Sequence, residues 1–289
     1  MELKEKPKYS LYYLAIILFL PILLCQCEKL EPPKINNYIH VGHTRIFDTL
    51  HQVIDPRMEA IDYGKFDMVL LGGDLCEESS KRYDILEYLD TIFDLRSDST
   101  LWALGNHDNA NLDFVEKITG RPYYYATHIN GITFLVLYTQ EREDWICEIT
   151  GEQLQLIRNV TDTIKESSHL VLMTHKLIWI KDHPEMKEHK GNNRYDWSCN
   201  YEITRTNWFL EILPILRKVE ESGVEVIALA GDIGNNVSEF EVQTSFVCTS
   251  NSETLFPISP ASAITSTPLS STFLKIGSIS KNQFVRVIS

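Results

Sequence analysis

The sequence predicts a layered α/β fold that contains two sheets. Short apolar runs that end in glycine and polar residues alternate with stretches of helical periodicity, a pattern typical of α/β proteins. The clearest runs are 66–71 and 101–104, which lead into Gly72-Gly73-Asp74 and Gly105-Asn106-His107-Asp108. Asn130-Gly131, between two alternating runs, is a hairpin signal, and we expect this hairpin to start the second sheet.

Size and charge narrow the class of protein. A chain of 289 residues holds one α/β domain with a sizeable core, because such a chain buries roughly 75% of its unfolded surface. We expect that domain over 38–245. Hydrophobic residues make up 44% and charged residues 23%, as in ordinary globular proteins. A formal net charge of -13 argues against general binding of nucleic acid, whose phosphates need Lys and Arg partners.

The front of the chain has the order of a secretory signal. Three lysines lie within the first ten residues, and an almost wholly apolar run, 11–24, precedes Cys25-Gln26-Cys27. That run is short for a membrane-spanning helix, which needs about 20 residues. We expect export to the cell envelope, with 1–27 a signal of lipoprotein type, Cys27 or Cys25 the lipid-modified residue, and 28–37 a tether. Since neither cysteine follows a small residue, a retained signal anchor is the alternative.

The remaining cysteines give no metal or redox signature. They lie far apart and show no CxxC spacing. An exported protein is able to pair some of them, but the sequence favours buried thiols for each. These residues are Cys76, Cys147, Cys199 and Cys248.

The first half of the domain alternates strand and helix. Strands are expected at 38–41, 66–71 and 101–104; helices are expected through Leu50 and Met58, over 80–95, and after Asn109-Ala110-Asn111. In the 80–95 stretch, Tyr83, Leu86, Leu89, Ile92 and Phe93 recur at helical spacing, which predicts an amphipathic helix that covers the sheet.

The second half continues from the hairpin at 123–128 and 132–137. Thr150 and Gln153 have the spacing of a capping box and predict a helix that runs through Ile164. A strand at 170–175, a helix at 209–219 despite Pro214, and a strand at 224–230 follow.

Two stretches lack such periodicity. Residues 176–207 are polar and aromatic, and we expect a loop over a crevice, with His183 and His189 as surface histidines. The Ser/Thr-rich tail, 246–289, fits closing strands poorly, although 273–276 and 284–288 have strand character. A shifted reading frame near the end of the gene is one hypothesis for this change, and resequencing tests it.

Polar side chains follow two neighbouring strands of the predicted sheet. Groups beyond the carboxyl ends of such strands gather in one crevice. This would bring together Asp74, Asn106, His107 and Asp108. Carboxylate, amide oxygen and imidazole suit a divalent metal better than a packed core.

These two blocks resemble the second and third signature blocks of the calcineurin-like metallophosphoesterases. Gly-Asn-His-Asp after an apolar run is a specific signal, whereas Gly-Asp alone is weak. By the order of blocks, the resemblance extends from about Tyr38 to Gly234. It implies an αββα sandwich and a metal-dependent phosphoester hydrolase that uses Mn, Fe or Zn, with a phosphorylated small molecule or a phosphodiester as substrate.

The resemblance also implies a ligand set, with departures. His175 matches the single metal-binding histidine at a later strand end, and Asp232 stands where the family has the first histidine of Gly-His-x-His. We therefore expect one firm site formed by Asp74, Asn106, His175 and Asp232. His43 and Arg45 replace the family's Asp-x-His, and Gly234 replaces the last histidine.

Arg45 is unable to bind a metal because a guanidinium has no lone pair to give. It would occupy the place of the missing cation, clamp a phosphate, or form an ordinary salt bridge. His43 would complete a weaker second site. By resemblance His107 is the catalytic histidine, Asp108 would orient it, and Arg45 would stabilise the transition state.

Two readings compete with hydrolysis. A binding or scaffold protein at the cell envelope would keep the fold and lose the reaction, and the altered first and last blocks support that alternative. In the other reading, the blocks are turn chemistry in an unrelated α/β protein.

Overall fold

The computed structural model describes residues 36–45, 53–142, 146–179, 199 and 205–232, together with the backbone of three strands at 237–242, 271–276 and 284–285. All of them belong to one unit of the chain, residues 36–289. Its elements in chain order are β1 (Tyr38–Val41), α2 (Pro56–Glu59), the 3₁₀ turn η1 (Tyr63–Lys65), β2 (Met68–Leu71), α3 (Tyr83–Phe93), β3 (Thr100–Trp102), α4 (Leu112–Thr119), β4 (Tyr125–Ile129), β5 (Ile132–Val136), α5 (Gly151–Thr163), β6 (His169–Thr174), the π-helical turn η4 (Trp208–Ile212), α7 (Leu213–Glu221), β7 (Glu225–Ala230), β8 (Val237–Val242), β9 (Ser271–Ile276) and β10 (Phe284–Val285).

The strands form two sheets. The first has the order β10-β1-β2-β3, and all its pairs are parallel. The second has the order β4-β5-β6-β7-β9-β8, with β5, β6 and β7 parallel at its centre. The hairpin β4–β5 is antiparallel, and Asn130 and Gly131 both have positive φ at its turn. The predicted hairpin, and its place in a second sheet, are confirmed.

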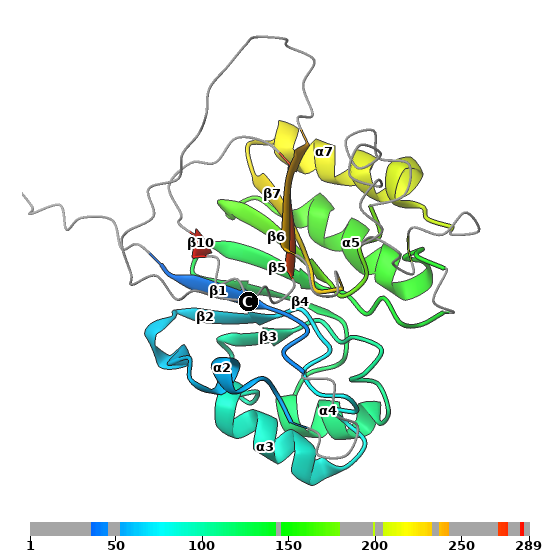
Figure 1. Cartoon of the computed structure of the whole chain (residues 1–289). Coiled ribbons are helices and arrows are strands. Elements are labelled where there is room, and N and C mark those ends of the chain that lie inside the picture. The colour runs from blue at the N-terminus through cyan, green and yellow to red at the C-terminus, as the bar shows by residue number, and fades with distance from the viewer. Residues whose placement is uncertain are drawn as a thin grey trace, which may run out of the picture. The chain divides into compact units, whose positions relative to one another are not determined.

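Three hydrophobic clusters define the layers. One lies between the sheets and joins Met68 and Leu70 of β2 to Phe134 of β5 and Val171 of β6. The other two lie on the outer faces: α2, α3 and α4 cover the first sheet, and α5 and α7 cover the second (Figure 1). The predicted αββα sandwich is therefore confirmed.

The period of two along a strand explains how β2 serves two layers at once. Successive side chains point to opposite faces of a sheet. Val69 and Leu71 accordingly join the cluster under the helices, and Met68 and Leu70 join the cluster between the sheets. A strand that is buried on both faces reads as a continuous apolar run, which is why 66–71 is so visible in the sequence.

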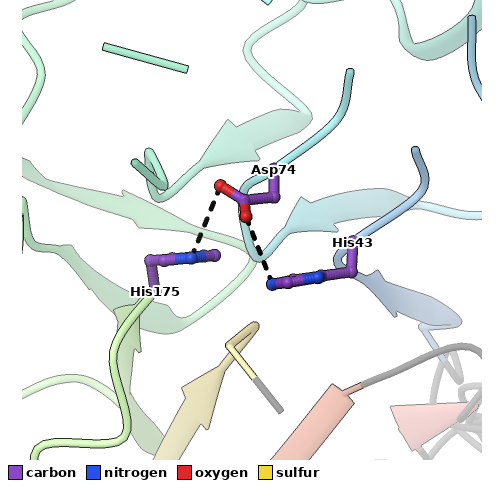
Figure 2. A group of neighbouring side chains, drawn as sticks. All are labelled: His43, Asp74 and His175. Carbon is purple, nitrogen blue, oxygen red and sulfur yellow. Dashed lines mark ion pairs between the residues drawn. The ribbon is translucent and has the colours of Figure 1, made fainter. Parts of the chain in front are cut away.

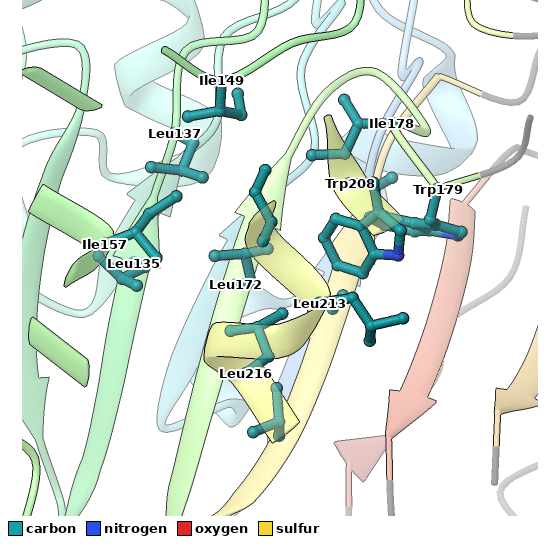
Figure 3. Close-up of a cluster of buried hydrophobic side chains, with 14 of the residues drawn as sticks. Leu135, Leu137, Ile149, Ile157, Leu172, Ile178, Trp179, Trp208, Leu213 and Leu216 are labelled. Atoms are coloured by element: carbon teal, nitrogen blue, oxygen red, sulfur yellow. The ribbon is translucent and has the colours of Figure 1, made fainter. Parts of the chain in front are cut away.

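The cluster on the outer face of the second sheet contains two tryptophans, one of which, Trp179, belongs to the stretch 176–207 that we expected to be a loop over the crevice. Trp179 and Trp208 are fully buried, with ring centroids 5.4 Å apart, among side chains such as Leu172 and Leu213 (Figure 3). The expectation for Trp179 is wrong, because its side chain belongs to the core. Within the predicted loop, residues 180–198 and 200–204, including His183 and His189, lie outside the described residues.

The same cluster contains a disulfide between Cys147 and Cys199, which are 52 positions apart in sequence. The prediction of buried thiols is therefore wrong for this pair. It is confirmed for Cys76, a fully buried thiol that is not part of a disulfide. Cys248 lies outside the described residues.

The capping residues expected from the sequence are confirmed for one helix and wrong for another. Asn111 caps α4 by accepting a hydrogen bond from the backbone of Phe114. The capping box predicted for α5 is wrong: the Thr150 side chain makes no capping hydrogen bond, and the Gln153 amide bonds the backbone N–H and carbonyl of Tyr138. A long-range partner has displaced the local one.

Other expected elements are present with different bounds. Of the helix expected through Leu50 and Met58, the structure describes only α2, and 46–52 lie outside the described residues. Pro214 lies in the first turn of α7, where proline is tolerated, directly after the π-helical turn.

The tail supplies strands to both sheets. β9 pairs with β7 and β8, and β10 pairs with β1. Among the residues that the structure describes, no helix combines the length and apolar character needed to cross a bilayer.

Candidate metal centre

The site lies where the carboxyl ends of β1, β2 and β7 approach one another. The three strands are followed directly by Gly42, Gly72 and Gly231, and no side chain would fit between these glycines. A Cβ on Gly231 would lie 1.9 Å from the carbonyl oxygen of Gly72, and one on Gly72 would lie 2.8 Å from the Cα of Gly231. Glycine at these positions thus lets strand ends from different sheets meet.

The residues that follow these glycines turn back into the junction. His43 and Asp74 adopt left-handed backbone conformations, with φ of 50° and 57°. For residues with a Cβ this conformation costs on the order of 1 kcal/mol each. The His43 amide donates to the carbonyl of Gly73 at 2.8 Å, and this hydrogen bond holds the two turns together.

Four of the predicted site residues meet at this junction. The Nε2 atom of His43 lies 3.3 Å from Oδ2 of Asp74 and 3.4 Å from Oδ1 of Asp232, and Nε2 of His175 lies 3.5 Å from Oδ1 of Asp74. Figure 2 shows the Asp74 carboxylate directed at both imidazole rings. The rings are parallel, with centroids 5.4 Å apart.

The spacing of these atoms fits ligands of one ion. Donor atoms about 2.1 Å from a tetrahedral metal are roughly 3.4 Å apart. One ligand atom from each of His43, Asp74 and His175 lies within 4.8 Å of the other two. Both Nε2 atoms are buried and make no hydrogen bond.

The protonation of His175 suits a ligand as well. Its Nδ1 donates to the carbonyl of Gly72 at 2.7 Å, which leaves the lone pair of Nε2 facing Asp74. Such an outer hydrogen bond is the usual way in which a metal-binding histidine is oriented. The donor set of imidazoles and carboxylates therefore fits a divalent ion such as Zn²⁺, Fe or Mn²⁺.

The charges of the buried carboxylates also favour a metal ion at this site. Burial alone would lower the pKa of His175, but the carboxylates of Asp74 and Asp232 and the hydrogen bond to Gly72 raise it above its ordinary value. Burial acts to raise the pKa of Asp232, and interactions with His43 and His175 outweigh it, so that the pKa is lowered. The carboxylates thus attract a cation to this point, a role that a bound metal ion would fill.

Asp108 has a different task from the one expected. Its carboxylate accepts hydrogen bonds from the backbone amides of Asp74, Leu75 and Gly105 and from the hydroxyl of Ser79. Burial, followed by the charge of Asp74, raises its pKa. The structure therefore corrects the expectation that Asp108 orients His107 directly: Asp108 fixes the two loops that carry Asp74 and His107.

Arg45 and His107 flank the same carboxylate. Nε of Arg45 and Nε2 of His107 each lie 3.9 Å from Oδ2 of Asp74. The guanidinium forms an ion pair with Glu77, and Nδ1 of His107 donates to the backbone carbonyl of Glu77 at 2.7 Å. Sequence reasoning missed Glu77. Its signal was a charged residue three positions after Asp74, next to the buried pair 75–76.

One predicted ligand, Asn106, lies apart from this cluster. The side chain of Asn106 is exposed, and no hydrogen bond joins it to the other predicted ligands in the described part of the chain. Gly234 lies outside the described residues. His43, expected only at a weaker second site, stands here with Asp74 and His175.

The packing of Asp74 against Gly105 leaves no room for a side chain at position 105. A Cβ on Gly105 would lie 2.1 Å from Oδ1 of Asp74 and 2.7 Å from Cε1 of His175. The glycine of Gly-Asn-His-Asp is therefore required by the carboxylate and the imidazole that it touches.

Comparisons with known proteins agree with this geometry. The comparison with curated proteins returned no match. A protein-family model described as calcineurin-like phosphoesterase matches residues 39–215, more than half of the 289-residue chain. The matched residues include most of β1, all of β2, the Gly-Asn-His-Asp block and His175. The family implies a hydrolase that uses divalent metal ions. The chain belongs to the calcineurin-like phosphoesterase family.

Proposed function

We propose that this protein is a metal-dependent phosphoester hydrolase whose metal is held by His43, Asp74, His175 and Asp232. The observation that carries the proposal is the pair of buried, unbonded Nε2 atoms on either side of a shared carboxylate. Each Nε2 lies 3.3–3.5 Å from a carboxylate oxygen without forming a hydrogen bond, and a metal ion bound between them would satisfy buried polar atoms that are otherwise costly.

A divalent ion at this point supplies Lewis acidity toward a phosphoryl oxygen and lowers the pKa of water. The protein's own groups do the rest. His107, whose Nδ1–H donates to the Glu77 carbonyl, would in its imidazolium form give the Nε2 proton to the leaving oxygen and return to the neutral ring. Arg45, partly exposed beside Asp74, donates to the equatorial oxygens of the phosphoryl group.

The test uses the full chain with Mn²⁺ and two chromogenic substrates, an aryl phosphate monoester and an aryl phosphodiester. We expect hydrolysis of at least one, lost on chelation. Asp74→Ala should lose both metal and activity. His107→Ala should keep the metal and lose about 10²–10⁴-fold in kcat, as expected when a general acid is removed.

The alternative is a binding or scaffold protein that keeps the fold without hydrolysis. The ion pair between Arg45 and Glu77 favours it, since a guanidinium stands beside the metal-binding carboxylate of Asp74. Wild-type protein that takes up metal and hydrolyses neither ester would establish this alternative over the enzyme.

We also propose that the protein is exported. The disulfide between Cys147 and Cys199 supports this, because disulfides persist in oxidising compartments. The lipoprotein signal at 1–27 and the tether at 28–37 stay predictions from the sequence, and they lie outside the described residues except at 36–37.

A further inference from the structure

We infer that Glu77 is a positioning residue that holds Arg45 and His107 in place beside the metal centre. The inference rests on the proposed function and deepens it, because it assigns the non-metal side of the site to one acidic residue. Glu77 binds the guanidinium through its side chain and the imidazole through its backbone.

The contact between Glu77 and Arg45 uses one N–H donor of the guanidinium and leaves its other donors without a bond to Glu77. Nη1 of Arg45 donates to Oε2 of Glu77, while Nε makes no hydrogen bond. A guanidinium carries five N–H donors in a rigid fork, so fixing one end aims the rest of the fork. Nε is itself buried, but the side chains of Arg45 and Glu77 are 19% and 14% exposed, which leaves part of the guanidinium within reach of a phosphate that enters from solvent.

The contact with His107 fixes the ring. Nδ1 donates to the Glu77 carbonyl at 2.7 Å and lies 3.8 Å from Oε1 of the same residue. Nε2 consequently faces Asp74, at 3.9 Å from Oδ2. The ring and the guanidinium thus take their positions from one residue and converge on one carboxylate oxygen.

Glu77 also keeps Arg45 away from the metal-binding carboxylate. At 3.9 Å the guanidinium is too far from Oδ2 of Asp74 for a hydrogen bond. Without Glu77, the guanidinium would hydrogen-bond to Asp74 instead, and its N–H groups would no longer be available to a phosphate.

The test compares Glu77→Ala, Glu77→Gln, Arg45→Met and the double variant Glu77→Ala/Arg45→Met in the full, Mn²⁺-loaded chain. The matched control is Glu78→Gln. It removes the neighbouring carboxylate, which forms an ion pair with Lys81 at the surface. The readouts are the Kd of inorganic phosphate by calorimetry, kcat and KM, metal content and the melting temperature.

We expect Glu77→Ala to weaken phosphate binding about tenfold, as the loss of a charge-assisted anchor predicts. The double variant should bind phosphate no worse than Arg45→Met alone, because Glu77 acts on the phosphate through Arg45. Glu78→Gln should match wild type. If Glu77→Ala fails to fold, Glu77→Gln takes its place, with a smaller loss in the same direction.

Tighter phosphate binding in either Glu77 variant would overturn the inference, since that is the result of removing a carboxylate that only neutralises Arg45. Losses that add in the double variant, or wild-type protein that binds no phosphate, would overturn it as well. If wild-type protein binds phosphate and hydrolyses no ester, the proposed function fails, and the phosphate affinities still decide the role of Glu77.

Discussion

Reducing the disulfide between Cys147 and Cys199 should destabilise the domain by about 4 kcal/mol at most. The bond joins positions 52 residues apart. In the chain-entropy model, closing a loop of that length removes about 14 cal/mol/K from the unfolded chain, which is about 4 kcal/mol at 25 °C. Measured values for native disulfides are commonly 2–4 kcal/mol.

Chemical denaturation with and without reductant measures this difference. The control is Cys147→Ser/Cys199→Ser, in which reductant should not shift the midpoint, so that effects on other cysteines are subtracted. Both sulfurs are buried in the cluster between the second sheet and α5 and α7. A reduced wild type that unfolds at the same denaturant concentration as the oxidised protein would refute the reasoning.

Two further predictions follow from the site and from the first short helix. Gly105→Ala should lower metal affinity more than tenfold, because its Cβ would lie 2.1 Å from Oδ1 of Asp74. The control is Gly64→Ala, whose Cβ meets only a surface side chain and which should bind metal normally. Equal metal content of the two variants by elemental analysis would count against this packing argument. Asp55→Ala should cost about 1 kcal/mol at pH 7 by removing the cap of α2. The hydrogen bond from Arg57 lowers the pKa of Asp55 below 3.8, so the wild-type advantage should be complete above about pH 4 and decline below it in urea unfolding, and an advantage that grew on acidification would contradict the assignment.

The strands that carry the site were predictable because each is buried on both faces. An apolar run such as 68–71, which ends in two glycines and an aspartate, has few readings other than a central strand. The glycines at the strand ends are also needed for a contact between the two sheets, which the sequence of a single strand does not reveal. Gly72 and Gly231 come from different sheets, and only the fold shows that their backbones touch.

Roles that depend on partners distant in sequence were not predictable from spacing. Gln153 has the spacing of a capping residue, yet it bonds Tyr138, 15 positions away. Asp108 adjoins His107 in sequence, yet its oxygens bind backbone amides across the junction, including that of Asp74. In both cases a buried backbone group without another partner takes the side chain, since leaving such a group unsatisfied costs more than losing a local contact.

Departures from the family pattern were visible in the sequence, but their consequences were not. Arg45 reads as a lost metal ligand, and the structure adds the ion pair with Glu77 that holds it. His43 reads as a remnant of a second site, and the structure places it against both Asp74 and Asp232. The order of motifs identifies the residues, whereas the backbone turns at 43 and 74 decide which of them meet.

The most direct test of the metal centre is the number of Mn²⁺ or Zn²⁺ ions that the full chain retains after equilibrium dialysis, measured for wild type, His43→Ala and His175→Ala. We predict about one tightly held ion in wild type and a large loss of affinity in both variants, because both histidines offer an unbonded Nε2 to the same carboxylate. Wild-type protein that retains no ion, or variants that retain as much as wild type, would contradict the account.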